Sequence, residues 1–173
     1  NEIIGIVDYS YNYYAINPRS EADMILGANT VTLAIPPQSV GLHSSVSVPV
    51  NAYGIDVLQN YQSYSFSISF NPNILNYESI STAGTLSQTG NVNATVESGV
   101  LSLSYQSNTA LNGQGVLLNL NFYSANTGTT SLNFSQGIIG AGVIPNCING
   151  SVTVNSSYNS PGDTLTVIQR PIL

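Results

Sequence analysis

The stretch 63-SYSFSISF-70 decides the fold, because large apolar side chains alternate along it with serines. One side of an extended chain would carry Tyr64, Phe66, Ile68 and Phe70. The opposite side would carry the four serines. A period of two residues is that of a β-strand and not of a helix. The sequence therefore predicts a strand over residues 63–70 with one face in the core and the other in solvent.

Comparable stretches recur along the chain, and turn residues such as Asn112-Gly113 and Asn126-Thr127-Gly128 separate them. Further strands are predicted over residues 30–35, 44–54, 91–98, 100–107, 116–125, 129–136, 150–157 and 163–169. No convincing amphipathic helix interrupts this series. We therefore predict an all-β fold, an antiparallel β-sandwich of jelly-roll or immunoglobulin-like type with an extended N-terminal β arm.

Prolines and glycines indicate where the predicted strands end or become irregular. Pro36-Pro37 ends the strand over 30–35, and Pro49 predicts an edge position or a bulge inside the strand over 44–54. Gly113-Gln114-Gly115 lies between two predicted strands and is interpreted as a turn.

Composition narrows the possible partners. Only 6% of the 173 residues are charged, lysine is absent and the formal net charge is −6. Nucleic acids and anionic membranes both require basic patches, so neither is an expected partner. No apolar run approaches the ~20 residues of a membrane span. The single cysteine, Cys147, excludes an intrachain disulfide and is interpreted as a small buried apolar residue.

The N-terminal stretch 3-IIGIVDYSYNYYAI-16 alternates with the strand period before the sandwich begins. We predict three parts: an extended arm over residues 1–16, a polar joint over 17–29 and the sandwich over 30–173. The arm is too rich in isoleucine, valine and tyrosine to be a disordered segment. It pairs either with its own domain as an edge strand or with another subunit.

Pairing in trans makes the arm a donor strand, and its expected contact residues are Ile3, Ile4, Ile6, Val7, Tyr9, Tyr11 and Tyr13. Full burial of each large side chain contributes roughly 1.5–3 kcal/mol. A head-to-tail contact between identical subunits that does not close on itself grows into a fibre. This hypothesis predicts a homo-oligomer built by donor-strand complementation.

Four N-x-[ST] sequons predict covalent N-glycans at Asn93, Asn133, Asn149 and Asn155. The chain begins at Asn1 and not at Met, which leads us to expect a removed signal peptide. Together these features predict an extracellular or cell-surface location.

The sequence offers little for catalysis. His43 is the only histidine and is interpreted as a surface residue, because no nucleophile-elbow pattern accompanies it. One histidine and one cysteine cannot supply a usual zinc site. Asp56, Glu78 and Glu97 are candidates for a pair of glycosidase carboxylates, but isolated polar surroundings favour solvated surface acids. We predict no enzyme, no catalytic or metal residue and no cofactor.

Two weaker binding hypotheses remain. Glu21 and Asp23 could bind calcium, although no EF-hand loop surrounds them. Tyrosine rings can stack on sugars, and Tyr53, Tyr61 and Tyr64 gather near one strand end in the sequence. For the tyrosines of the arm, packing of one strand face is the favoured interpretation.

Three motifs carry a resemblance to a known family: the turn 70-FNPNIL-75 with Tyr77, Ile80 and Gly84 after it, the earlier 44-SSVSVPVNAYGI-55 and the later 113-GQGVLLNLNFYS-124. Through these motifs, residues 30–154 resemble a cohesin module. Asn71 stands where that family usually has Asp. The resemblance implies a nine-stranded jelly roll, and cohesins bind dockerin domains through one sheet face.

The whole chain, with its arm, few charges and sequons, is similar in architecture to subunits of archaeal thread filaments, which resemble chaperone–usher pilins. Two functions follow from these resemblances. The first is a structural subunit of a glycosylated surface filament. The alternative is a cohesin-like module that binds a partner domain or a glycan in an extracellular assembly.

Overall fold

A computed structural model describes residues 2–3, 6–10, 13–17, 24–25 and 30–156. Residues 30–156 contain twelve of its elements. In chain order these are β5 (Thr32–Ala34), β6 (Gln38–Gly41), β7 (Ser45–Ile55), the 3-10 helix η2 (Val57–Gln59), β8 (Ser63–Ser69), β9 (Leu75–Ser81), β10 (Asn91–Glu97), β11 (Val100–Gln106), β12 (Gly113–Ser124), β13 (Gly128–Ile139), β14 (Asn146–Ile148) and β15 (Gly150–Asn155).

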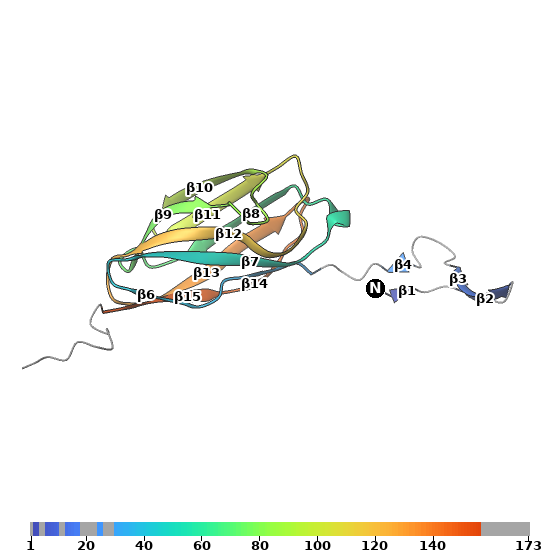
Figure 1. Cartoon of the computed structure of the whole chain (residues 1–173), viewed down its shortest axis with the longest axis horizontal. Coiled ribbons are helices and arrows are strands. Elements are labelled where there is room, and N and C mark those ends of the chain that lie inside the picture. The colour runs from blue at the N-terminus through green and yellow to red at the C-terminus, as the bar shows by residue number, and fades with distance from the viewer. Residues whose placement is uncertain (1, 4–5, 11–12, 18–23, 26–29, 157–173) are drawn as a thin grey trace, which may run out of the picture.

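These strands form a sandwich of two sheets (Figure 1). One sheet has six strands in the order β10-β11-β8-β13-β15-β6, and the other has five in the order β14-β5-β7-β12-β9. Most neighbours are antiparallel, as in the β8–β11 pair, where Phe66 lies opposite Leu103. The predicted all-β sandwich is confirmed.

The first and last strands of the sandwich run side by side and change sheets together. β5 pairs in parallel with β14, and β6 pairs in parallel with β15. The chain passes from one sheet to the other at Pro36-Pro37 and again at Asn149. In Figure 1 the chain enters the sandwich at one end, before β5, and leaves it at the opposite end, after β15.

The core lies between the sheets and follows the alternation seen in the sequence. Tyr64, Phe66 and Ile68 of β8 are buried, whereas the serines between them are half-buried or exposed. From the other sheet, Phe122 of β12 is fully buried and packs edge-to-face on Phe70 with ring centroids 5.2 Å apart. Burying each such side chain contributes roughly 1.5–3 kcal/mol, so this alternation supplies the main force that holds the sheets together.

Gly113, Gly115 and Pro49 all lie inside strands. Gly113-Gln114-Gly115 is not a turn but the start of β12, where register shifts against β7 accommodate the glycines. Pro49 lies inside β7, opposite Asn119 of β12. β5 pairs with β7 only as far as Asn51, so at Pro49 the strand has a ladder partner on one side and a missing N–H is tolerated.

The N-terminal arm differs from the single strand predicted over residues 3–16. The described parts are β1 (Glu2–Ile3), β2 (Ile6–Ser10), β3 (Tyr13–Asn17) and β4 (Met24–Ile25). β2 pairs antiparallel with β3, and β1 with β4, each pair as a separate two-stranded sheet. A period of two residues marks extended backbone but does not show where a strand folds back, so the alternation alone could not predict this pairing.

Tyr64 gives the core a titratable group. Its hydroxyl lies 2.8 Å from Oγ of Ser87, and its ring stacks on Tyr105 with centroids 4.8 Å apart. Burial raises the pKa of Tyr64 well above the ordinary tyrosine value because the phenolate would lose its hydration. The hydrogen bond with Ser87 opposes this shift, and the proximity of Tyr105 adds to it. The unfolded chain therefore releases this proton first. The contribution of Tyr64 to the free energy of unfolding is fully present below about pH 10 and declines as the pH rises above that value.

We expect Tyr64→Phe to flatten this alkaline decline, because it removes the ionisable hydroxyl. The free energy of unfolding, measured by urea titration at several values above about pH 10, should fall less steeply with pH than in the wild type. Tyr53→Phe, at a position 44% exposed, is the control and should keep the wild-type slope. Equal slopes for wild type and Tyr64→Phe would contradict the assignment.

Candidate interaction face on the six-stranded sheet

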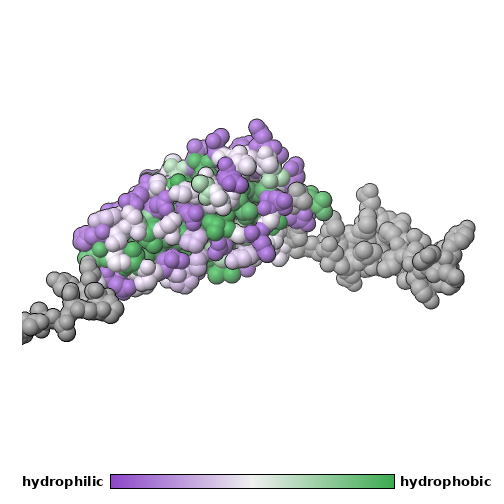
Figure 2. Space-filling model, viewed as in Figure 1, coloured by the Kyte–Doolittle hydropathy of each residue, from purple (hydrophilic) through white to green (hydrophobic). Residues whose placement is uncertain are grey.

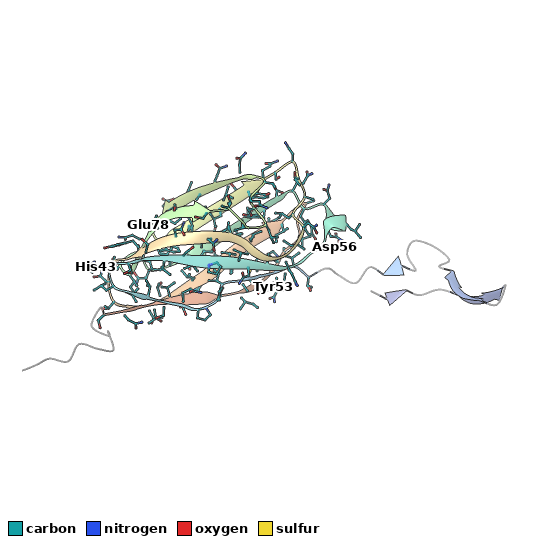
Figure 3. All side chains as sticks on the ribbon, viewed as in Figure 1. His43, Tyr53, Asp56 and Glu78 are labelled. Carbon is teal, nitrogen blue, oxygen red and sulfur yellow. The ribbon has the colours of Figure 1, made fainter. Side chains whose placement is uncertain are left out.

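The residues considered for catalysis lie apart. Figure 3 shows His43 at one end of the sandwich and Asp56 at the other, with Glu78 on β9. Nδ1 of His43 lies 3.3 Å from the hydroxyl of Tyr123. Oδ1 of Asp56 accepts a hydrogen bond of 2.9 Å from the backbone N–H of Leu58, which caps η2. His43 and Asp56 therefore cannot act together.

The other sequence candidates are placed as follows. Among the described residues there is no group of three or more His, Cys, Asp or Glu side chains placed to hold a metal ion. Glu21 and Asp23 lie outside the described residues. Nor does any described helix have the length and apolar character needed to cross a bilayer.

Tyr53, Tyr61 and Tyr64, considered above for sugar binding, do not form a common exposed surface. Tyr61 and Tyr64 are buried in the core, and of the three only Tyr53 is exposed.

Cys147 is half-buried, and its Sγ lies 3.7 Å from the carbonyl oxygen of Pro145. Burial raises the pKa of the Cys147 thiol and so disfavours the reactive thiolate.

The outer side of the six-stranded sheet carries a different kind of surface. Strand register places Asn93, Ser104, Ser65 and Ile138 in one row across β10, β11, β8 and β13. The next row along contains Thr95, Ser102 and Ser67, on β10, β11 and β8. We call these two rows, with Glu97, Val100, Ser69 and Asn133 of the third row, the serine face. It presents short hydroxyl and amide side chains on a regular lattice of strands about 4.8 Å apart.

The serine face is poor in acidic and basic residues, and Glu97 is the one such residue in its three rows. Oγ of Ser67 lies 3.0 Å from Oγ of Ser102, and this bond crosses from β8 to β11. Other hydroxyls of the face are exposed, Ser104 among them. Hydroxyls of this kind can donate to or accept from a partner, so the face can form many neutral hydrogen bonds.

An apolar hollow borders the serine face at the end of β13. Its volume is about 480 Å³, and its lining contains Gly137, Ile138, Gly142 and Ile144. Ile138 is 48% exposed and Ile144 is 81% exposed. Exposed isoleucines beside glycines leave room for an apolar side chain of a partner.

On the outer side of the five-stranded sheet, polar side chains are hydrogen-bonded to one another. Nδ2 of Asn121 donates to Oγ of Ser79 at 3.1 Å and to Oγ of Ser81 at 2.8 Å, bridging β12 and β9. Tyr123, which lies on β12 like Asn121, contacts His43 in the turn between β6 and β7. Figure 2 shows hydrophobic residues scattered among hydrophilic ones over the viewed side of the sandwich, without a large apolar patch. These polar groups already have partners, so this sheet offers less to a second protein.

Two of the four sequons lie on the serine face and two lie at the ends of β15. Asn93 and Asn133 are exposed and belong to the serine face. Asn149 lies between β14 and β15, and its Oδ1 accepts a 2.9 Å hydrogen bond from the backbone N–H of Phe134. Asn155 ends β15, and its Nδ2 donates to Oγ of Ser39 at 2.7 Å.

Sequence reasoning missed the apolar hollow. The strand over 129–136 was predicted to end before Ile138, whereas β13 continues to Ile139. The run 136-QGIIGAGVIP-145 contains three glycines and five apolar residues in no clear period. Such a run between two strands was the available signal for an exposed apolar loop.

Several solved structures resemble the sandwich. A non-cellulosomal cohesin from the archaeon Archaeoglobus fulgidus is 22% identical, with a TM-score of 0.64, and the match covers 75% of this chain and 94% of that one. The sixth cohesin of scaffoldin B from Acetivibrio cellulolyticus, solved with a dockerin, is 22% identical with a TM-score of 0.63 and coverages of 73% and 99%. A cohesin from Clostridium thermocellum, also in a cohesin–dockerin complex, is 14% identical with a TM-score of 0.62 and coverages of 73% and 100%.

These structural matches establish the fold alone. A search of curated proteins by sequence gives no match. The family model described as "Cohesin domain" matches residues 31–154, well over half of the chain and nearly the whole of the sandwich. In the turn 70–75, Oδ1 of Asn71 accepts a 3.0 Å hydrogen bond from the backbone N–H of Asn73. The chain therefore belongs to the cohesin family.

Proposed function

We propose that this chain is a non-catalytic binding module that holds a dockerin-type partner domain in an extracellular assembly. Membership of the cohesin family supports this function, because two of the similar cohesins are solved as cohesin–dockerin complexes. Recognition of a partner domain, rather than the filament, is therefore the leading hypothesis.

The observation that carries the proposal is the serine face beside its apolar hollow. Three strands, β8, β10 and β11, present hydroxyls, among them the exposed Ser65, Thr95 and Ser104. Ile138 and Ile144 stand exposed at the edge. Interfaces combine an apolar anchor in a pocket with surrounding polar contacts. Arg19 and Arg170, the only permanent cations of the chain, lie outside residues 30–156. The complementary partner surface is therefore neutral or weakly basic, with one apolar side chain that enters the hollow.

The test is direct binding between the purified full chain and purified dockerin domains encoded in the same genome. We expect at least one of them to bind with a Kd of about 1 μM or tighter, measured by calorimetry. If none binds, the proposed function is wrong.

Substitutions on the two sheets locate the interface. Ser65→Arg in the middle of the serine face, and Ile138→Asp beside the hollow, are each expected to weaken binding at least about tenfold, equivalent to about 1.4 kcal/mol. Ser47→Arg on β7 is the matched control, because Ser47 is exposed on the outer side of the other sheet. It should leave the Kd unchanged. A loss of affinity confined to Ser47→Arg would move the interface to the five-stranded sheet.

Head-to-tail assembly by donor-strand complementation stays a prediction, as do the homo-oligomer and the donor role of the arm. In the structure β2 and β3 are each other's ladder partners, with Val7 opposite Ile16 and Tyr9 opposite Tyr14. A donor strand would first have to leave this pairing. For that reason we place partner recognition first.

A further inference from the structure

Two of the four sequons lie on the face that is proposed to bind the partner. Asn93 occupies the same row as Ser104 and Ser65, and Asn133 lies opposite Ser69 in the third row. Both asparagines are exposed, as are Thr95 and Ser135, the hydroxyl residues that complete their sequons. Within residues 30–156 neither asparagine side chain takes part in a hydrogen bond, in contrast to Asn149 and Asn155.

The two sequons lie at diagonally opposite corners of the serine face. They are separated by three strand spacings of about 4.8 Å and by about four residues along the strands, which gives roughly 20 Å between their Cα atoms. A glycan is bulky and strongly hydrated. One at each corner would stand over the rows between them, where a partner has to make close contact.

We propose that N-glycosylation of Asn93 and Asn133 closes the serine face to its partner domain, so that glycan occupancy sets how much of the protein can bind. This inference rests on the proposed function. The modification transfers an oligosaccharide from a lipid-pyrophosphate-linked donor. Nδ2 of the asparagine forms a bond with the anomeric carbon, the bond from that carbon to the pyrophosphate oxygen breaks, and the amide proton leaves to a base as the lipid pyrophosphate departs.

Asn155 serves as the internal contrast. It lies at the far end of β15, next to β6 and outside the rows of the serine face, so a glycan there leaves these rows uncovered. Asn149 gives no such contrast, because its Oδ1 accepts a hydrogen bond from the N–H of Phe134, the residue next to Asn133. A glycan at Asn149 would therefore stand at the edge of the third row.

The experiment compares the full chain secreted from a host that performs N-glycosylation with the same chain from a host that does not. Mass spectrometry of glycopeptides gives the occupancy of each sequon, and calorimetry gives the affinity for the dockerin domain that binds the unglycosylated protein. We expect occupied Asn93 and Asn133, and at least a tenfold weaker affinity of the glycosylated form.

Matched variants separate the glycan from the side chain. The double variant Thr95→Ala/Ser135→Ala removes both sequons but keeps both asparagines. Its affinity should be the same from either host; it is compared only between hosts because Thr95 itself belongs to the serine face. Thr95→Ser/Ser135→Thr keeps both sequons and should again bind weakly when glycosylated. Ser157→Ala removes the Asn155 sequon and should not restore binding.

The outcomes are distinguishable. If the unglycosylated chain binds no dockerin domain, the proposed function fails and the inference falls with it. If that chain binds, but Asn93 and Asn133 are unoccupied, or are occupied with unchanged affinity, only the inference is overturned.

Discussion

Phe122→Ala is expected to lower the free energy of unfolding by about 3–5 kcal/mol, as for other large aromatic side chains removed from a well-packed core. Phe122 is fully buried, and its ring packs edge-to-face on Phe70 at 5.2 Å and on Tyr77 at 6.0 Å. Alanine would remove both contacts and leave a cavity between the sheets. A change of this size is a large part of the stability of a typical domain.

Urea or thermal unfolding of the full chain measures this effect. Tyr123→Ala is the matched control, because Tyr123 is the next residue on β12 and points to the outer side of the sheet, where it contacts His43. Its cost should be well below that of Phe122→Ala. Similar losses for the two variants would mean that the core does not lie where the alternation of β12 places it.

Gly150→Ala has the second largest expected effect, about 3 kcal/mol, at the upper end of the range for overpacking. A Cβ at position 150 would lie 2.5 Å from Cγ2 and 2.5 Å from the carbonyl oxygen of Ile35. The backbone oxygen cannot move aside without shifting the chain where it leaves β5. The variant should therefore unfold at a clearly lower urea concentration.

Gly41→Ala tests whether the loss comes from this contact and not from replacing a strand glycine. Gly41 lies in β6, beside β15, and the nearest atom to its added Cβ is Oγ of Ser44 at 3.8 Å, an ordinary contact. It is expected to be neutral or to stabilise by about 0.4–1 kcal/mol. Equal destabilisation by both substitutions would rule out the contact with Ile35 as the cause.

The strands that the sequence predicts are those whose side chains alternate over many residues. β8 is the clearest case, since its buried and exposed positions follow the pattern in 63–70. β6 and β14 have four and three residues, too few to show a period. They are strands because β15 and β5, more than a hundred residues away, lie beside them in parallel. Pairing between such distant segments leaves no local signal.

The candidate site shows the same limit. The serines of β8 were predictable as an exposed row, and the sequons at Asn93 and Asn133 are legible in the sequence. Their arrangement on one face depends on the register of β10 with β11 and of β13 with β8, which includes a bulge between Phe134 and Gln136. The cohesin resemblance over 30–154 agrees with the family match over 31–154. The strand predicted over 163–169 lies outside the described residues.

The parallel pairing of the first and last strands has a mechanical consequence. A pull applied between Thr30 and Ser156 draws β5 and β6 one way and β14 and β15 the other, because the chain enters and leaves at opposite ends. The main-chain bonds Asn146 N–Val31 O, Ile35 N–Ile148 O and Leu42 N–Asn155 O, at 2.8, 3.1 and 2.8 Å, are then loaded in shear. They resist together instead of opening one after another, so tension along the polypeptide is borne by the strands that join the two sheets, while the serine face is left undistorted.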